Sequence, residues 1–277
     1  MSALAVLKAG PGATVQDLGR RGLLTQAVPV GGAWLEPLHR CTNLALGNPE
    51  GSATVELPLH GARFRAVGAL TVALDGVPVA LRDGETLDVP PAPWAVRYLA
   101  LPGGVAVPVA LGARGTLLCA GVGGLQGRAL RVGDLLPAQS PTPLGALKVC
   151  AWDPCLGAPL PVVPGPDALP PGALEVLLGA VWTVSARLDR RGTRLEGPRL
   201  PTLCDRPGSW PMVPGAVEVP QDGVPIVLGP EHPTTGGYPV VAVLPHAARG
   251  LLAARRPGSA VRFFTAWPGG CSTPRAG

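Results

Sequence analysis

Short apolar runs separated by turn residues recur along the chain. Four of them, rich in aliphatic side chains, cover residues 69–74, 95–100, 174–178 and 240–244 and are bounded by Gly, Pro or Asp-Gly pairs. Runs of this length between turn signals are typical of strands in barrels and sandwiches. The pattern therefore predicts a mainly β fold.

Two segments depart from the strand pattern and predict short helices. Pro37–Leu46 starts with proline, spaces its apolar side chains along one helical face and stops before Gly47. Pro245–Arg256 repeats this arrangement and stops before Pro257. Proline at the start of a helix and Gly or Pro just past its end are the usual boundary signals.

The chain of 277 residues is long enough for two modest domains. Pro and small polar residues replace the strand pattern over 137–145, which we interpret as a linker between domains at 1–140 and 146–277. Exchange of strands between the two domains stays open. A Pro-rich stretch over 159–171 is interpreted as a long loop, either a lid, a partner contact or a solvated spacer. DGVPVAL at 75–81 and DGVPIVL at 222–228 each indicate an Asp-Gly turn that leads into a strand, one in each half.

Charge and composition exclude some classes of function. The net charge is +5, but the only lysines are Lys8 and Lys148 and the arginines are scattered, so the clustered basic patch of a nucleic-acid-binding protein is absent. The N-terminal residues carry no basic leader, and no apolar run reaches the roughly 18 residues of a membrane span. We expect a soluble cytoplasmic protein with no nucleic-acid or membrane partner.

The metal-ligating residue types show no ligand spacing. The six cysteines include no Cys-x-x-Cys pair, and we interpret them as buried thiols of a reducing compartment. The four histidines lie far apart, and only His232 falls in a candidate site. We therefore predict no metal in this chain.

Self-sufficient catalytic motifs are absent as well. The sequence contains no phosphate-binding loop, no nucleophile elbow and no His-Glu-x-x-His zinc helix. GVGGLQG at 121–127 comes near a dinucleotide fingerprint, but Gln126 replaces the last glycine, and we interpret the segment as strand, turn and strand.

The densest polar cluster covers 215–239. Two predicted strands end in a loop that carries Glu231, Thr234 and Thr235 next to Gly236 and Gly237. Hydroxyls and the backbone N–H groups of such glycines can converge on an anion. A tight hairpin without a ligand is an equal alternative.

At this cluster the chain resembles a known family. TTGGYP at 234–239, preceded by VPQDGVPIVL at 219–228, resembles the signature of the C-type subunits of 5-oxoprolinase, a family also called KipA-like or allophanate hydrolase subunit 2. Further stretches match the family in order, namely TVQDLGR at 14–20, VPVGGA at 28–33, LGAR at 111–114, GGLQGR at 123–128 and DRRGTRLEG at 189–197.

The resemblance implies a fold of two cyclophilin-like β-barrel domains with a few short helices. It also implies a complex with a KipI-like B subunit and an A-type, LamB/YcsF-like subunit that hydrolyses 5-oxo-L-proline to L-glutamate. ATP would be a co-substrate bound mainly by another subunit. Two alternatives are a carboxyltransferase component of a biotin-dependent urea-type carboxylase and a non-catalytic antagonist of a KipI-type kinase inhibitor.

Opening a lactam needs a base, a holder for the carboxylate and donors for the developing oxyanion. We predict as catalytic Glu218, Glu231 and Thr235, and as substrate-binding Arg190, Arg194, Thr234, Gly236, Gly237 and Tyr238. For both arginines an ion pair with a neighbour such as Asp189 or Glu196 is an equal alternative. For Gln16, Asp17 and Arg20 we favour a structural turn.

The chain also departs from the family pattern. Leu35 and Ala106 stand where relatives commonly carry Asp, Glu218 replaces a common Gln, and 231–233 replaces an Asp-x-Gln run. Glu231 keeps the charge of that run, whereas Leu35 and Ala106 do not. The lost carboxylates indicate either an altered substrate or a subunit that only binds.

Overall fold

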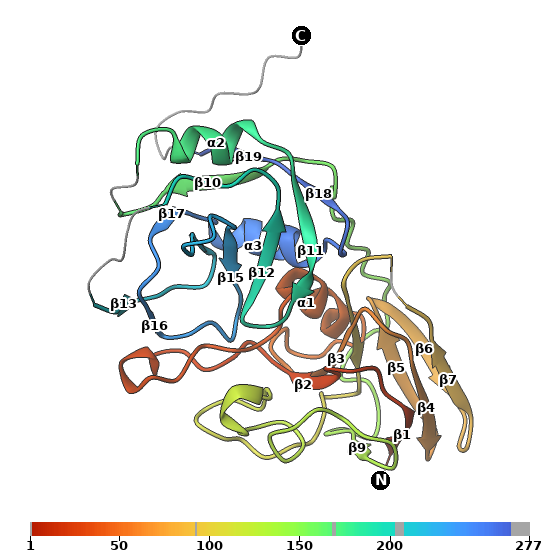
Figure 1. The fold of residues 1–277 in the computed structure, drawn as a ribbon. Coiled ribbons are helices and arrows are strands. Elements are labelled where there is room, and N and C mark those ends of the chain that lie inside the picture. The colour runs from red at the N-terminus through yellow and green to blue at the C-terminus, as the bar shows by residue number, and fades with distance from the viewer. Residues whose placement is uncertain (1, 92, 168–169, 203–207, 267–277) are drawn as a thin grey trace. The chain divides into compact units, whose positions relative to one another are not determined.

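The computed structural model describes residues 2–91, 93–167, 170–202 and 208–266. It is mainly β, with three short α-helices within the described residues. The chain divides into two compact units (Figure 1). Unit 1 comprises Met1–Cys155 with Ala253–Arg256, and unit 2 comprises Leu156–Leu252 with Pro257–Gly277.

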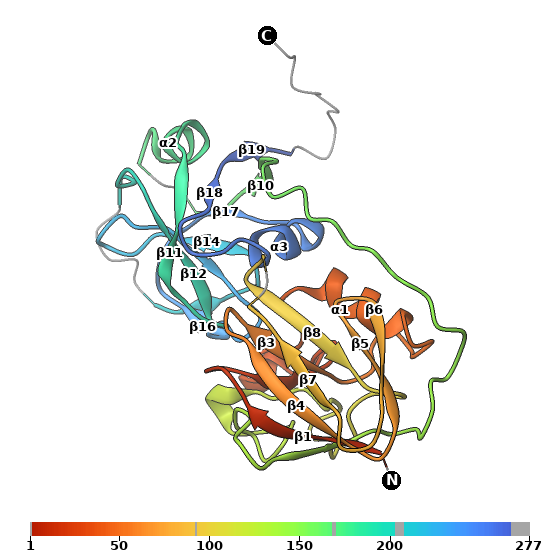
Figure 2. The same ribbon diagram turned by 90° about the vertical axis from the view of Figure 1, so that its right-hand side faces the viewer.

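Unit 1 contains two antiparallel sheets (Figure 2). The first has the order β7-β4-β1-β9, formed by β1 (Ala3–Lys8), β4 (Ala62–Val67), β7 (Thr86–Val89) and β9 (Leu135–Pro137). The second has the order β2-β3-β8-β5-β6, formed by β2 (Thr14–Gln16), β3 (Thr54–Pro58), β5 (Leu70–Leu74), β6 (Val77–Leu81) and β8 (Val96–Ala100). Strand β4 alternates buried and exposed residues, so one face of its sheet packs on the core around Phe64.

A helix and two 3-10 turns complete unit 1. Helix α1 (Glu36–Leu44) has Pro37 in its first turn and packs against β8 and β5. The chain leaves it through Gly47, which has a φ of 68° that favours glycine. The two 3-10 turns are η1 (Leu24–Gln26) and η2 (Leu118–Ala120).

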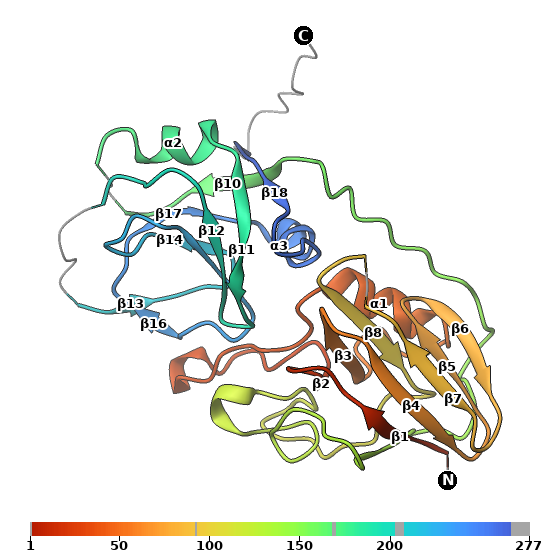
Figure 3. The same cartoon turned by 45° about the vertical axis from the view of Figure 1, so that its right-hand side comes forward.

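Unit 2 is built on one eight-stranded sheet (Figure 3). Its order is β18 (Ala260–Val261), β11 (Trp182–Leu188), β12 (Gly192–Glu196), β15 (Ile226–Leu228), β14 (Ala216–Glu218), β17 (Val240–Val243), β10 (Leu160–Pro164) and β19 (Phe263–Thr265). All neighbours are antiparallel except β10 and β19. The two edge strands, β18 and β19, follow each other directly in the chain, which curls the sheet into a nearly closed barrel around Trp182 and Val217.

Three smaller groups of elements accompany the barrel of unit 2. Helix α2 (Ala173–Gly179) packs against β19 and β17, and helix α3 (His246–Ala253) follows β17. Strands β13 (Trp210–Pro211) and β16 (Thr235–Gly236) form a separate two-stranded ribbon. None of the described helices has the length and apolar character that crossing a bilayer requires.

Most of the strands and helices expected from the pattern are confirmed. The apolar runs at 69–74, 95–100 and 240–244 correspond to β5, β8 and β17, and both predicted helices are present as α1 and α3. Asp75 and Gly76 form the two-residue turn between β5 and β6, with positive φ at both positions.

Three of the segment assignments are wrong. The run at 174–178, predicted as a strand, lies in α2, because five apolar residues after Pro171-Gly172 satisfy either period and the helix packs Ala173 and Leu177 inward. The predicted loop at 159–171 contains β10, whose prolines disguise a strand that buries Leu160 and Val162 completely. The segment 121–127 consists of turns with a single bridge between Leu117 and Val122, because several of its glycines adopt positive φ.

Candidate functional site

Glu218 and Arg194 lie on the same face of the unit 2 sheet. Arg194 of β12 and Glu218 of β14 are both in register with Ile226 of the strand between them. Residues directly opposite each other on neighbouring strands project from the same face. The neighbours Val217 and Val227 point the other way, into the main core. Glu218 and Arg194 therefore flank Ile226 on the outer face of the barrel.

The predicted loop 234–238 belongs to the same outer face. Met212 packs there on Ala216 and Leu228, which have the side-chain direction of Glu218 and Ile226. A Cβ atom at Gly236 would lie 2.6 Å from Met212 Cε, so β16 packs closely against the Met212 side chain. The tertiary structure thus brings the predicted TTGGY loop and Glu218 to one face of one sheet.

Glu218 has the environment of a proton-transfer group. Its side chain is 9% exposed, and it has no hydrogen-bond partner among the residues that the structure describes. Burial raises its pKa to about 7, and the positive charge of Arg194 opposes that rise. A carboxyl group that titrates near neutral pH can both accept and return a proton under cellular conditions.

Arg190 and Glu231 are bonded to each other. Arg190 Nε lies 2.5 Å from Glu231 Oε1, and the two side chains are 6% and 2% exposed. Asp189, one of the neighbours considered from the sequence, instead caps a turn by accepting from the N–H groups of Arg191 and Gly192. The buried pair favours a structural role for Arg190 and Glu231, and their roles as substrate holder and base stay predictions.

The remaining predicted residues reach the surface. Arg194 is paired with Asp222 at 4.0 Å, and both side chains are well exposed. Thr235 is exposed, as is Tyr238, and Thr234 contributes its carbonyl to the N–H of Met212. An exposed ion pair contributes about 0–1 kcal/mol, so a ligand carboxylate can displace Asp222 at little cost.

His232 is fully buried in the loop that follows β15. Its Nδ1 lies 2.7 Å from the carbonyl oxygen of Pro233, and Nε2 has no partner among the described residues. Burial lowers its pKa, so the ring is neutral, with Nδ1 donating and Nε2 carrying a lone pair. Across the described ranges, no three His, Cys, Asp or Glu side chains gather in an arrangement that could hold a metal ion. The interpretation of the cysteines as buried thiols is wrong for Cys119 and Cys155, which are exposed, whereas Cys41 is buried and Cys150 is half-buried. Cys204 and Cys271 lie outside the described ranges.

Gln16, Asp17 and Arg20 make structural hydrogen bonds, although Gln16 lies in strand β2 rather than in the turn that the sequence favoured. Arg20 donates from Nη2 to the carbonyl of Gly115 at 2.6 Å, and Asp17 accepts from the N–H groups of Gly19 and Arg114. Gln16 donates to Thr14 and to the carbonyl of Thr116. These contacts join the start of the chain to 110–116.

Leu35 and Ala106, which replace common aspartates of the family, differ in their burial. Leu35 is fully buried with Leu38 and Tyr98, so an apolar contact occupies the place of the common aspartate. Ala106 is only partly buried.

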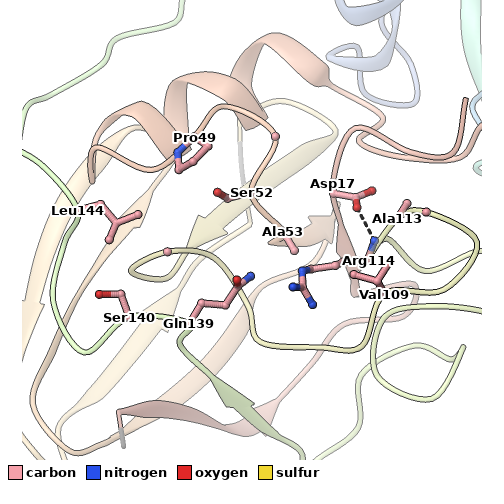
Figure 4. A pocket seen from close by; sticks show the side chains of 13 residues that line it. Asp17, Pro49, Ser52, Ala53, Val109, Ala113, Arg114, Gln139, Ser140 and Leu144 are labelled. Carbon is pink, nitrogen blue, oxygen red and sulfur yellow. Dashed lines mark hydrogen bonds between the residues drawn. The ribbon is translucent and has the colours of Figure 1, made fainter.

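A second group of polar side chains in unit 1 was not assigned a role from the sequence. Arg114, Gln139, Ser52 and Ser140 line a pocket of about 550 Å³ (Figure 4). The only sequence signal was that 111–114 matches a family motif, because the four residues come from segments far apart in the chain.

Comparisons with known proteins agree with this fold. Residues 26–265 match the family model described as carboxyltransferase domain, subdomain A and B. The chain is 32% identical to the C subunit of 5-oxoprolinase from Escherichia coli, over 94% of this chain and 90% of that protein. This chain belongs to that carboxyltransferase subdomain A and B family.

More distant members of the family are larger proteins. The chain is 27% identical to the urea amidolyase of Lachancea kluyveri over 91% of its own length, but covers only 16% of that enzyme. The crystal structure of TTHA0988 superposes with a TM-score of 0.87 and 28% identity, covering 95% of this chain and 56% of that one. In these relatives the family domain is thus joined to further sequence.

Proposed function

We propose that this chain is a subunit of an ATP-dependent 5-oxoprolinase that hydrolyses 5-oxo-L-proline to L-glutamate in the cytoplasm. The proposal rests mainly on the 32% identity to the C subunit of 5-oxoprolinase, because the match spans nearly the whole of both chains. We further propose that the chain acts with a KipI-like subunit and an A-type subunit.

The outer face of unit 2 supports a role for this chain in lactam hydrolysis. Glu218, with a pKa of about 7, can take a proton from the attacking water and return it to the leaving nitrogen. Arg194 can hold the substrate carboxylate in place of Asp222, and the exposed hydroxyl of Thr235 can donate to the developing oxyanion. ATP is assigned mainly to another subunit, since the chain has no phosphate-binding loop.

The test is glutamate formation by the chain co-purified with the KipI-like and A-type subunits, in the presence of 5-oxo-L-proline and ATP. Wild type is compared with Glu218→Gln and with the control Glu196→Gln, an exposed carboxylate on strand β12 of the same sheet. We expect Glu218→Gln to lower kcat by roughly 100-fold or more, the usual contribution of general acid-base catalysis. The control should stay within about twofold of wild type.

The pH profile gives a second readout for Glu218. Since the base must be ionised, the wild-type rate should rise with pH and level off above a pKa of about 7. Glutamate formation without this chain would contradict the proposed function. Full activity of Glu218→Gln would leave the function standing but move the base elsewhere.

A carboxyltransferase role is the second candidate. It is favoured by the family model and by the urea amidolyase relative. Carboxylation of urea by the complex with carboxybiotin, without 5-oxoproline turnover, would select it. A stable complex with the KipI-like subunit that performs neither reaction would point to the non-catalytic antagonist.

A further inference from the structure

The pocket in unit 1 is a preformed cavity between five segments of chain. Its walls come from 17, 49–53, 103, 109–114 and 139–144, and its volume is about 550 Å³, within the usual range for small-molecule sites. Backbone hydrogen bonds fix these walls, from Val105 N to Ala53 O at 2.8 Å, from Gln139 N to Gly104 O at 3.0 Å and from Ser140 N to Pro102 O at 3.0 Å. The pocket therefore does not depend on a ligand for its shape.

Arg114 presents one edge of its guanidinium to this pocket. Its backbone N–H donates to Asp17 Oδ2, and its Nη1 donates to the carbonyl of Val107. Among the described residues, nothing accepts from its Nε or Nη2. The Nε and Nη2 edge of an arginine is a two-donor fork that matches the two oxygens of a carboxylate. Contact with Val107 orients the group, so little side-chain entropy remains to be lost on binding.

Gln139 faces Arg114 from the opposite wall (Figure 4). Its Nε2 lies 3.3 Å from the carbonyl oxygen of Val105, a contact that uses one amide hydrogen and leaves the amide oxygen for another donor. Ser52 adds a hydroxyl to the same hollow, and Val109 and Leu144, 59% and 54% exposed, add apolar surface. A cationic fork opposite a neutral amide suits a ligand with a carboxylate next to a hydrogen-bonding group.

The charge around the pocket favours a single negative charge on the ligand. Asp17 lines the pocket as well, and both of its oxygens accept backbone N–H groups. Its negative charge offsets that of Arg114 at longer range and repels a dianion more strongly than a monoanion. A planar monoanionic carboxylate therefore fits better than a phosphate.

We propose that this pocket of unit 1 binds a small organic carboxylate, held in a bidentate contact by Nε and Nη2 of Arg114, with Gln139 bonding a neighbouring polar group. The residues of this site all belong to unit 1, whereas Glu218 and Arg194 belong to unit 2. The inference does not rest on the proposed function, because it uses only the residues around this hollow.

The test is titration calorimetry of the full chain, without ATP or partner subunits. The probes are 5-oxo-L-proline, propionate, the uncharged lactam 2-pyrrolidinone and inorganic phosphate. We expect both carboxylates to bind at least about tenfold more tightly than the other two probes, and Arg114→Gln to weaken both carboxylates at least about tenfold. Gln139→Met should weaken 5-oxo-L-proline more than propionate.

Two control variants locate the binding. Arg65→Gln removes an exposed arginine of β4 that does not line the pocket, and Arg194→Gln removes the arginine of the unit 2 site. Arg65→Gln should bind both carboxylates as wild type does, and Arg194→Gln should retain the binding that depends on Arg114. Loss of binding in Arg194→Gln but not in Arg114→Gln would move the carboxylate to unit 2 and overturn the proposal.

Other outcomes are equally decisive. Failure of the folded wild type to bind either carboxylate, or tighter binding of phosphate than of both, would overturn it. If Arg114→Gln does not fold, the NMR signal of the Arg114 Nε–H group in the wild type is followed instead. Adding propionate should shift this signal, and an unchanged signal would overturn the proposal. Binding without turnover in the assembled complex would contradict the proposed function and leave this site intact.

Discussion

Glu56 in unit 1 and Glu218 in unit 2 are both buried carboxyl groups on interior strands, yet their surroundings differ. Glu56 is fully buried and accepts hydrogen bonds from the N–H of Trp34 at 2.8 Å and the hydroxyl of Tyr98 at 2.6 Å. Glu218 has no such partner within the described part of the chain, and its pKa rises to about 7. The difference teaches that hydrogen bonding, rather than burial, separates a structural carboxylate from a reactive one here.

Other buried ionisable groups follow the pattern of Glu56, in contrast to His232, whose Nε2 has no partner among the described residues. His39 of unit 1 lies 2.9 Å from Thr54 Oγ1 and 3.3 Å from Asn43 Nδ2, so both ring nitrogens have partners. Arg190 and Glu231 of unit 2 neutralise each other. A buried ionisable group without a partner is costly, and such groups concentrate at functional sites. Glu218 is thus the acidic residue that best fits a catalytic role.

The largest expected effect comes from breaking the buried ion pair. Glu231→Ala leaves the positive charge of Arg190 in a buried site, which typically costs about 3–5 kcal/mol of unfolding free energy. Urea unfolding followed by circular dichroism would measure it. The exposed Glu196→Ala should change stability by less than about 0.5 kcal/mol, and an equally small effect of Glu231→Ala would remove the distinction between paired and unpaired carboxyls.

Lowering the pH should test the hydrogen-bonded surroundings of His39 in unit 1. Burial lowers the pKa of His39 from 6.5 to about 4, so the folded chain holds the ring neutral while the unfolded chain protonates it. Stability is therefore lost as pH falls below 6.5 toward 4, by about 3 kcal/mol for this one group. His39→Gln should show a flatter pH dependence of the unfolding free energy over that interval. Identical slopes for both proteins would mean that His39 is not held neutral.

Replacing Glu by Gln should change the stability in opposite directions at Glu56 and at Glu218. Glu56→Gln weakens two charge-assisted hydrogen bonds to neutral ones and should cost about 1–2 kcal/mol at pH 8. Thermal unfolding at pH 8 measures this loss. A stabilised Glu56→Gln variant would show that the hydrogen bonds from Trp34 and Tyr98 do not require a carboxylate.

A gain in stability, rather than a loss, is expected for Glu218→Gln. Because its pKa is raised in the folded chain, the ionised carboxylate weakens folding once pH exceeds the ordinary value of 4.5, and increasingly up to about 7. The variant should gain stability relative to wild type at pH 8 and lose that advantage at pH 4. A variant destabilised at pH 8 would indicate that Glu218 is structural after all.

Much of the fold was predictable from local patterns. Strands β5, β8 and β17 and helices α1 and α3 coincide with apolar runs and boundary residues, because turns and helix ends depend on neighbours in sequence. The run that became α2 fits both periods, and its packing against β19 and β17 decided the outcome. Strand β10 was missed because proline is rare within strands, although two different neighbours pair with different parts of it.

The sequence by itself determined the family, the mainly β class and the segment 215–239 as a candidate site, since motif order and turn residues are written along the chain. Only the tertiary structure decided which charged side chains are available to bind a ligand or transfer a proton. It pairs Arg190 with Glu231, 41 positions away, and it buries Glu218. It also brings Arg114, Gln139 and Ser52 together around one pocket. Desolvation and hydrogen bonding depend on which distant segments meet, and that information is not local in the sequence.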